Sequence, residues 1–76
     1  MKVTIESTTK IVRLNGVEAR IWEGQTDGGI RVHAYVTRVA VAAEEAPSVF
    51  RQFEAELREC RPPSAEVRFI PFDLIL

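Results

Sequence analysis

The chain has 76 residues, the size of one small domain, and we expect residues 1–76 to fold as a single unit. Ten Lys or Arg residues and eleven Asp or Glu residues give a formal net charge of −1, without the basic excess typical of nucleic-acid binders. With Cys60 the only cysteine and His33 the only histidine, an internal disulfide and a cysteine–histidine metal cluster are excluded. No stretch approaches the roughly 20 apolar residues of a membrane span, and none near Met1 has the apolar run of a signal peptide. The composition predicts a cytoplasmic, cofactor-free protein that binds no membrane.

Residues 2–14 and 17–23 are predicted to form a β-hairpin, because Asn15-Gly16 is the pair most typical of a tight type I′ turn. Ser7-Thr8-Thr9 interrupts the alternation of the first strand and predicts a bulge there. A two-residue turn fixes the pairing, which places Leu14 opposite Val17 and Val12 opposite Ala19 on one side of the sheet. The other side then pairs Arg13 with Glu18, Ile11 with Arg20 and Thr9 with Trp22.

A third strand is predicted from Ile30 to Thr37, after a turn within the stretch GQTDGG. We expect a loop of two or four residues, because either length turns the apolar residues Ile30, Val32, Ala34 and Val36 toward the core. The opposite side of the sheet then carries the basic and aromatic residues Arg13, Arg20, Trp22, Arg31, His33 and Tyr35.

A helix is predicted to begin at Pro47, because proline suits the first helical position, and Pro62-Pro63 ends it. Its predicted buried stripe consists of Val49, Phe50, Phe53, Leu57 and Cys60. Residues 65–76 are predicted to be extended, broken at Pro71, and to lie at a sheet edge. The predicted fold is an α+β domain of β-β-β-α-β order, with a mainly antiparallel sheet and one helix packed on one face.

The set Arg13, Arg20, Trp22, Arg31, His33 and Tyr35 is the candidate binding site. Trp, Tyr and Arg dominate protein interfaces, and aromatic residues beside arginines also stack nucleic-acid bases. The simpler alternative is cross-strand packing that stabilises the sheet. The apolar C-terminus, FIPFDLIL, either completes the sheet or offers an edge for dimerisation or strand addition. The acidic helix residues form either a solvated surface or a patch for a basic partner: Glu44, Glu45, Glu54, Glu56 and Glu59.

No motif predicts catalysis, and we expect that the protein is not an enzyme. His33 has no cysteine or acidic neighbour at a catalytic spacing, and Cys60 is expected to be an unreactive core residue. The stretch TDGG lacks the lysine and the following helix of a phosphate-binding loop.

Three stretches, MKVTIESTTKIV, NGVEARIWEGQTDGGIRV and VTRVAV, resemble a family of small proteins encoded by phages and prophages of proteobacteria. The resemblance covers most of the chain and implies a small accessory protein in the cytoplasm of a bacterial host. Such a protein would bind and inhibit or redirect a host protein or a defence complex, in the manner of an anti-CRISPR protein. Two alternatives stay open: a single-stranded nucleic-acid or RNA-binding module, and a homodimeric structural or assembly protein.

Overall fold

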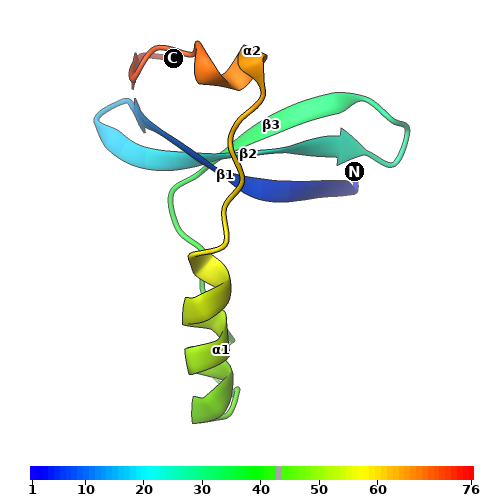
Figure 1. Cartoon of the computed structure of the whole chain (residues 1–76), viewed down its shortest axis with the longest axis vertical. Coiled ribbons are helices and arrows are strands. Elements are labelled where there is room, and N and C mark those ends of the chain that lie inside the picture. Colours follow the sequence, from blue (N-terminus) through cyan, green and yellow to red (C-terminus); the bar gives the residue numbers. More distant parts are fainter. Residues whose placement is uncertain (43) are drawn as a thin grey trace.

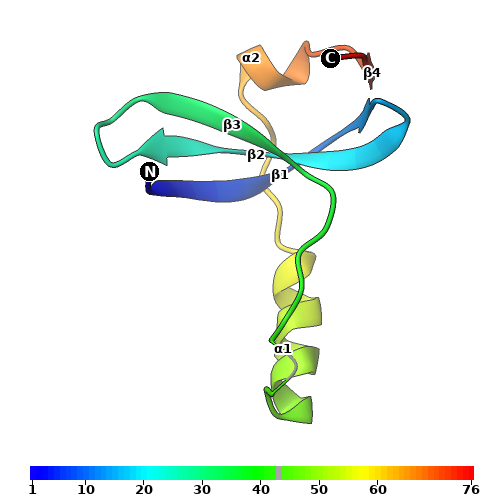
Figure 2. The same ribbon diagram turned by 180° about the vertical axis from the view of Figure 1, so that it is seen from behind.

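The structure is a computed structural model that describes residues 1–42 and 44–76. These residues form a sheet with the strand order β3-β2-β1-β4 (Figures 1 and 2). The strands are β1 (Val3–Leu14), β2 (Val17–Thr26), β3 (Arg31–Val36) and β4 (Asp73–Leu74), and the helices are α1 (Pro47–Leu57) and α2 (Ala65–Arg68). The first three strands pair antiparallel, and β4 lies parallel to β1. The predicted α+β class with a mainly antiparallel sheet is confirmed.

The predicted hairpin between β1 and β2 is present. Asn15 and Gly16 have φ values of 49° and 86°, as a type I′ turn requires. The predicted pairs hold from Leu14 back to Ile11, where the expected bulge begins. The bulge adds two residues to β1, so Ser7, and not Thr9, lies opposite Trp22. An even number of added residues leaves the side chains of β1 on their predicted sides of the sheet.

The turn between β2 and β3 differs from the prediction, and it reverses which side chains of β3 face the core. The loop has three residues, Asp27-Gly28-Gly29, closed by a hydrogen bond of 2.9 Å from the Thr26 N–H to the Ile30 carbonyl. Gly29 has a φ of 83°, the left-handed conformation that ends such a loop. An odd loop length reverses the alternation relative to loops of two or four residues. Tyr35 therefore lies opposite Ile21, and the expectation that the even-numbered residues of β3 face the core is wrong.

The core lies on the side of the sheet that carries Val12, Ala19 and Ile21, which we call the core face. All three side chains are buried, as predicted. The helix that covers them is α2, whose Val67 is 1% exposed, while Tyr35, Ile70 and Leu74 pack at the margin of the cluster. The prediction of an extended segment over 65–68 is therefore wrong. The expected edge strand is present as β4, beyond Pro71.

The longer helix α1 does not pack on the core face. It extends away from the opposite side of the sheet, as Figures 1 and 2 both show. None of its residues is buried, and Phe50 and Leu57 are 39% and 42% exposed. The sequence predicted the helix and its start at Pro47, but the prediction that its stripe is buried against the sheet is wrong. None of the helices within residues 1–42 and 44–76 has the length and apolarity needed to cross a membrane.

Candidate functional site

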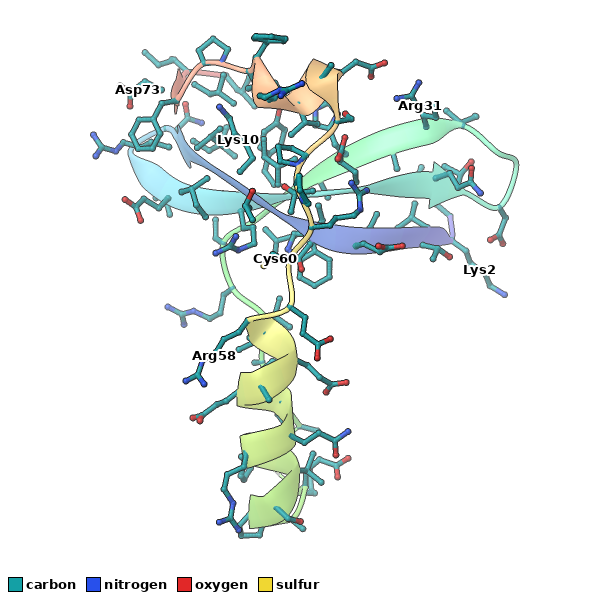
Figure 3. The ribbon with its side chains drawn as sticks, viewed as in Figure 1. Lys2, Lys10, Arg31, Arg58, Cys60 and Asp73 are labelled. Atoms are coloured by element: carbon teal, nitrogen blue, oxygen red, sulfur yellow. The ribbon has the colours of Figure 1, made fainter. Side chains whose placement is uncertain are left out.

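The structure divides the six candidate residues between the two sides of the sheet. Arg13, Arg20 and Trp22 lie on the side from which α1 extends, and we call this side the open face. Arg31, His33 and Tyr35 lie on the core face, because of the three-residue loop before β3. Figure 3 shows Arg31 directed to the α2 side of the sheet. The prediction that all six share one face is wrong, since only half of the set remains together.

On the open face, mostly apolar side chains lie in rows that run across β1, β2 and β3. One row pairs Ile5 with Gly24 and Val32, the next pairs Ser7 with Trp22 and Ala34, and a third pairs Ile11 with Arg20 and Val36. The apolar residues of these rows are all partly exposed: Ile5, Ile11, Trp22, Val32, Ala34 and Val36. This surface lies opposite the core face, and the part of the chain beside it in residues 1–42 and 44–76 is the base of α1 with its flanking segments (Figures 1 and 2).

A groove of about 290 Å³ lies where α1 meets the open face. Trp22 and Val36 line it from the sheet, and Phe53 and Leu57 line it from α1. Arg20, Arg38 and Glu56 add charged groups to its lining. The groove therefore combines one large aromatic side chain, several aliphatic ones and charges of both signs.

Two of the arginines on this side are held by contacts within the chain. The Arg20 guanidinium donates a hydrogen bond of 2.7 Å to the carbonyl of Thr8, which fixes it at the bulge of β1. Arg13 lies 3.8 Å from the carboxylate of Asp73, and its guanidinium carbon is 5.4 Å from the centre of the Phe72 ring. These contacts hold the positive charges of Arg13 and Arg20 at the protein surface, beside the apolar rows.

A second hollow, of about 440 Å³, lies on the core face beside α2 and is organised by Glu23. The Glu23 carboxylate accepts hydrogen bonds from the Ser64 N–H at 2.9 Å, from the Ser64 hydroxyl and from the Arg61 guanidinium at 3.0 Å. Burial raises the pKa of Glu23, but the hydrogen bonds from Ser64 and the charge and hydrogen bond of Arg61 outweigh it, so the net pKa lies below 4.5. Glu23 thus fixes the chain where it crosses from the α1 side to α2.

The remaining candidates on the core face have structural contacts. Arg31 pairs with Glu66 of α2 at 3.2 Å, and both side chains are largely exposed. His33 is exposed, and its Nε2 lies 3.2 Å from the hydroxyl of Tyr35, with the two rings edge to face. Tyr35 packs against the core. Of these contacts only that of Tyr35, which lies opposite Ile21, is packing between neighbouring strands, whereas Arg31 contacts α2 and His33 contacts a residue of its own strand.

Cys60 lies at the base of α1, partly exposed, rather than in the core as expected (Figure 3). Its sulfur is 3.6 Å from the Ser7 hydroxyl. The part of the chain that the structure describes contains no group of three or more His, Cys, Asp or Glu side chains placed to hold a metal ion.

The sequence did not identify Phe53 and Leu57 as site residues, because their helical spacing indicated a core stripe. It also gave Glu23 no role, since its partners Arg61 and Ser64 are some 40 residues away in the chain. In comparisons with protein-family models, with curated proteins and with solved structures, the chain matches none of them. The resemblance to phage-encoded proteins therefore stays a prediction from the sequence stretches alone.

Proposed function

We propose that the protein acts by binding another polypeptide on its open face, and not by catalysis. The observation that carries this proposal is the groove at Trp22, where an indole lies among aliphatic side chains of the sheet and of α1 with arginines beside it. Trp and Arg are the residues that contribute most to protein interfaces, especially where apolar neighbours exclude water around them. The apolar rows of β1, β2 and β3 extend this surface beyond the groove.

The charges around the groove favour a protein partner over a nucleic acid. Arg31 lies on the other side of the sheet and is paired with Glu66, so it adds no positive charge to the open face. Glu56 lines the groove itself, Glu54 lies on the same helix, and Glu59 lies two residues beyond the end of that helix. Carboxylates at these positions repel a phosphate backbone, whose neutralisation supplies most of the affinity in nucleic-acid binding.

The phage-type resemblance of the sequence gives the class of partner to search first. A small accessory protein of this kind is expected to bind a host protein or a defence complex in the bacterial cytoplasm and to inhibit or redirect it. The open face suits such binding, because Trp22 can serve as an aromatic anchor for the partner and needs no cofactor to do so.

A retention experiment tests the proposal. The wild-type protein is immobilised and exposed to a bacterial lysate that also contains a second, differently tagged copy of the chain. Trp22→Ala is expected to weaken retention of the bound protein about 30-fold or more, the effect of removing an interface anchor. His33→Ala is the matched control, because it also shortens an exposed ring on the sheet but lies on the core face.

Equal retention by wild type and Trp22→Ala would contradict the proposal. So would salt-sensitive binding of a single-stranded oligonucleotide at about 50 mM salt that is lost in Arg20→Ala, since this would identify a nucleic-acid surface. Circular dichroism of each variant confirms that the fold is retained.

A further inference from the structure

We infer that the partner of the open face is a second copy of the chain, with α1 of each copy lying across the open face of the other. This inference rests on the proposed function, because it assigns an occupant to the same surface. The two contacts are equivalent and related by a two-fold axis, the commonest symmetry of homo-oligomers. We call residues 37–42 and 44–60, which include α1, the arm.

The first argument is the surface area. The chain has an accessible surface of 5887 Å², whereas a folded monomer of 8.6 kDa has about 4,700 Å². The radius of gyration is 13.9 Å, against about 11 Å for a compact domain of this length. Each copy therefore has about 1,200 Å² more accessible surface than a compact monomer of the same mass. Burial of this excess by two copies gives about 2,400 Å², within the range of permanent homodimers.

The second argument is the stability of α1. The helix has 11 residues, and isolated helices shorter than about 12–15 residues are marginal in water. Ala46 at its N-cap makes no side-chain hydrogen bond to the first turn, and the helix has no buried residue. Its order therefore requires an apolar surface for Phe50 and its neighbours, and the open face is such a surface.

The third argument is complementarity in size and charge. A helix of 11 residues is about 16 Å long, and three adjacent strands are about 14 Å wide, so α1 spans β1, β2 and β3. Phe50, Phe53 and Leu57 supply an apolar stripe that matches the apolar rows of the sheet. Glutamates flank the stripe at 54 and 56, and arginines border the open face at 13, 20 and 38. Arg13 is already paired with Asp73 and α1 also carries Arg51, so the opposite charges that meet in this arrangement are Glu54 and Glu56 of one copy and Arg20 and Arg38 of the other.

The arm cannot cover its own open face in this conformation, because its base is fixed. Only three residues separate the end of α1 from Arg61, whose N–H donates a hydrogen bond of 3.1 Å to the Ser7 carbonyl. The Ser7 hydroxyl donates one of 2.8 Å to the Glu59 carbonyl. These contacts hold the last turn of α1 beside Trp22 while the rest of the helix points away from the sheet (Figure 1).

Light scattering of the purified full chain at about 100 µM tests the inference. The wild type is expected at about 17 kDa, twice the chain mass of 8.6 kDa. Phe50→Glu on the arm and Val36→Glu on the open face are each expected to weaken dimerisation about 30-fold or more. Phe69→Glu is the matched control, because Phe69 is 78% exposed beyond α2 on the other side of the sheet, and it is expected to leave the dimer intact.

Mixing Phe50→Glu with Val36→Glu tests whether the arm of one copy contacts the open face of the other. A Phe50→Glu chain keeps a normal open face, and a Val36→Glu chain keeps a normal arm. An equimolar mixture therefore regains one of the two arm-to-face contacts, and we expect it to form a heterodimer that neither variant forms alone. Circular dichroism shows whether each variant keeps its sheet, so that loss of the dimer is not confused with unfolding.

The outcomes separate this inference from the proposed function. A wild type that stays at 8.6 kDa overturns the inference, and so does a dimer that persists in both glutamate variants or a mixture that stays monomeric. If such a monomer still retains a lysate protein in a Trp22-dependent manner, the proposed function stands with another partner. If it retains nothing, both fail.

Discussion

Replacing Glu23 with alanine tests the contact that fixes the start of α2 to the sheet. The Glu23 side chain is 11% exposed and accepts two hydrogen bonds from Ser64 and one from Arg61. A hydrogen bond to a charged group contributes about 1.5–3 kcal/mol, and a partly exposed ion pair such as the one with Arg61 adds about 1 kcal/mol at most. Because these contacts share one carboxylate and are not additive, we expect Glu23→Ala to lower the free energy of unfolding by about 2–3 kcal/mol.

The same carboxylate is expected to make stability depend on pH on the acid side. The folded-state pKa of Glu23 lies below its ordinary value of 4.5, so the ionised form favours the fold. The stabilisation is complete above the unfolded-state pKa and is lost as the pH falls through the lower folded-state pKa. Glu23→Gln lacks this ionisation. The difference in stability between wild type and Glu23→Gln should therefore be largest at neutral pH and shrink as the pH falls below 4.5.

Thermal unfolding followed by circular dichroism, at one fixed protein concentration, measures both effects. A loss of 1 kcal/mol lowers Tm by about 4–8 °C in a domain of this size, so Glu23→Ala is expected to lower Tm at neutral pH by about 8–24 °C. Glu18→Ala is the control, because Glu18 is an exposed glutamate of the same strand, and it should change stability by less than about 0.5 kcal/mol. Equal Tm values for the two alanine variants would refute the role of Glu23. A wild-type advantage over Glu23→Gln that stays constant down to about pH 3 would refute the pH argument.

Three further predictions concern the sheet and its core. Gly24→Ala is expected to lower the free energy of unfolding in urea by about 3 kcal/mol or more, because its Cβ would lie 1.8 Å from the Thr4 carbonyl oxygen. Gly28→Ala is the control and should be tolerated, because the nearest atom to its Cβ would be the Thr26 hydroxyl at 3.7 Å. Val67→Ala should cost about 2 kcal/mol by the same measurement, since Val67 is 1% exposed, while Val39→Ala, 40% exposed, should have little effect. Thr8→Val should lower the free energy of unfolding by about 1–3 kcal/mol, because it removes the buried hydroxyl that donates a hydrogen bond of 2.6 Å to the Ile21 carbonyl. Thr9→Val is its control, because Thr9 is exposed. Equal urea midpoints of unfolding for the two variants would contradict this prediction.

The features that the sequence predicted correctly depend on neighbouring residues. Asn15-Gly16 determines a tight turn by its own backbone preferences, and the turn then determines the pairs of the hairpin near it. Pro47 sets the start of α1 by fixing its own φ angle, and the segment beyond Pro71 forms the expected edge strand. Each of these signals acts within a few residues, so no knowledge of the tertiary structure was needed.

The features that were predicted wrongly depend on contacts between distant segments. An apolar stripe on a helix shows that the helix needs a partner surface, but it does not say which surface or which copy of the chain provides it. The four residues of α2 are too few for a helical period to be recognised, and their position depends on Glu23 and Ser64, which lie 41 residues apart. The core helix was therefore assigned to the segment with the stronger pattern.

The loop Asp27-Gly28-Gly29 has the largest consequence for the candidate site, because its length decides the chemistry of the open face. Loops of two, three and four residues are all compatible with adjacent glycines, since glycine adopts the positive φ that each requires. An even length would have put Arg31, His33 and Tyr35 beside Trp22, giving a basic aromatic surface suited to bases and phosphates. The three-residue loop instead places Val32, Ala34 and Val36 there. The open face is consequently apolar with arginines beside it, the surface that an acidic amphipathic helix such as α1 complements.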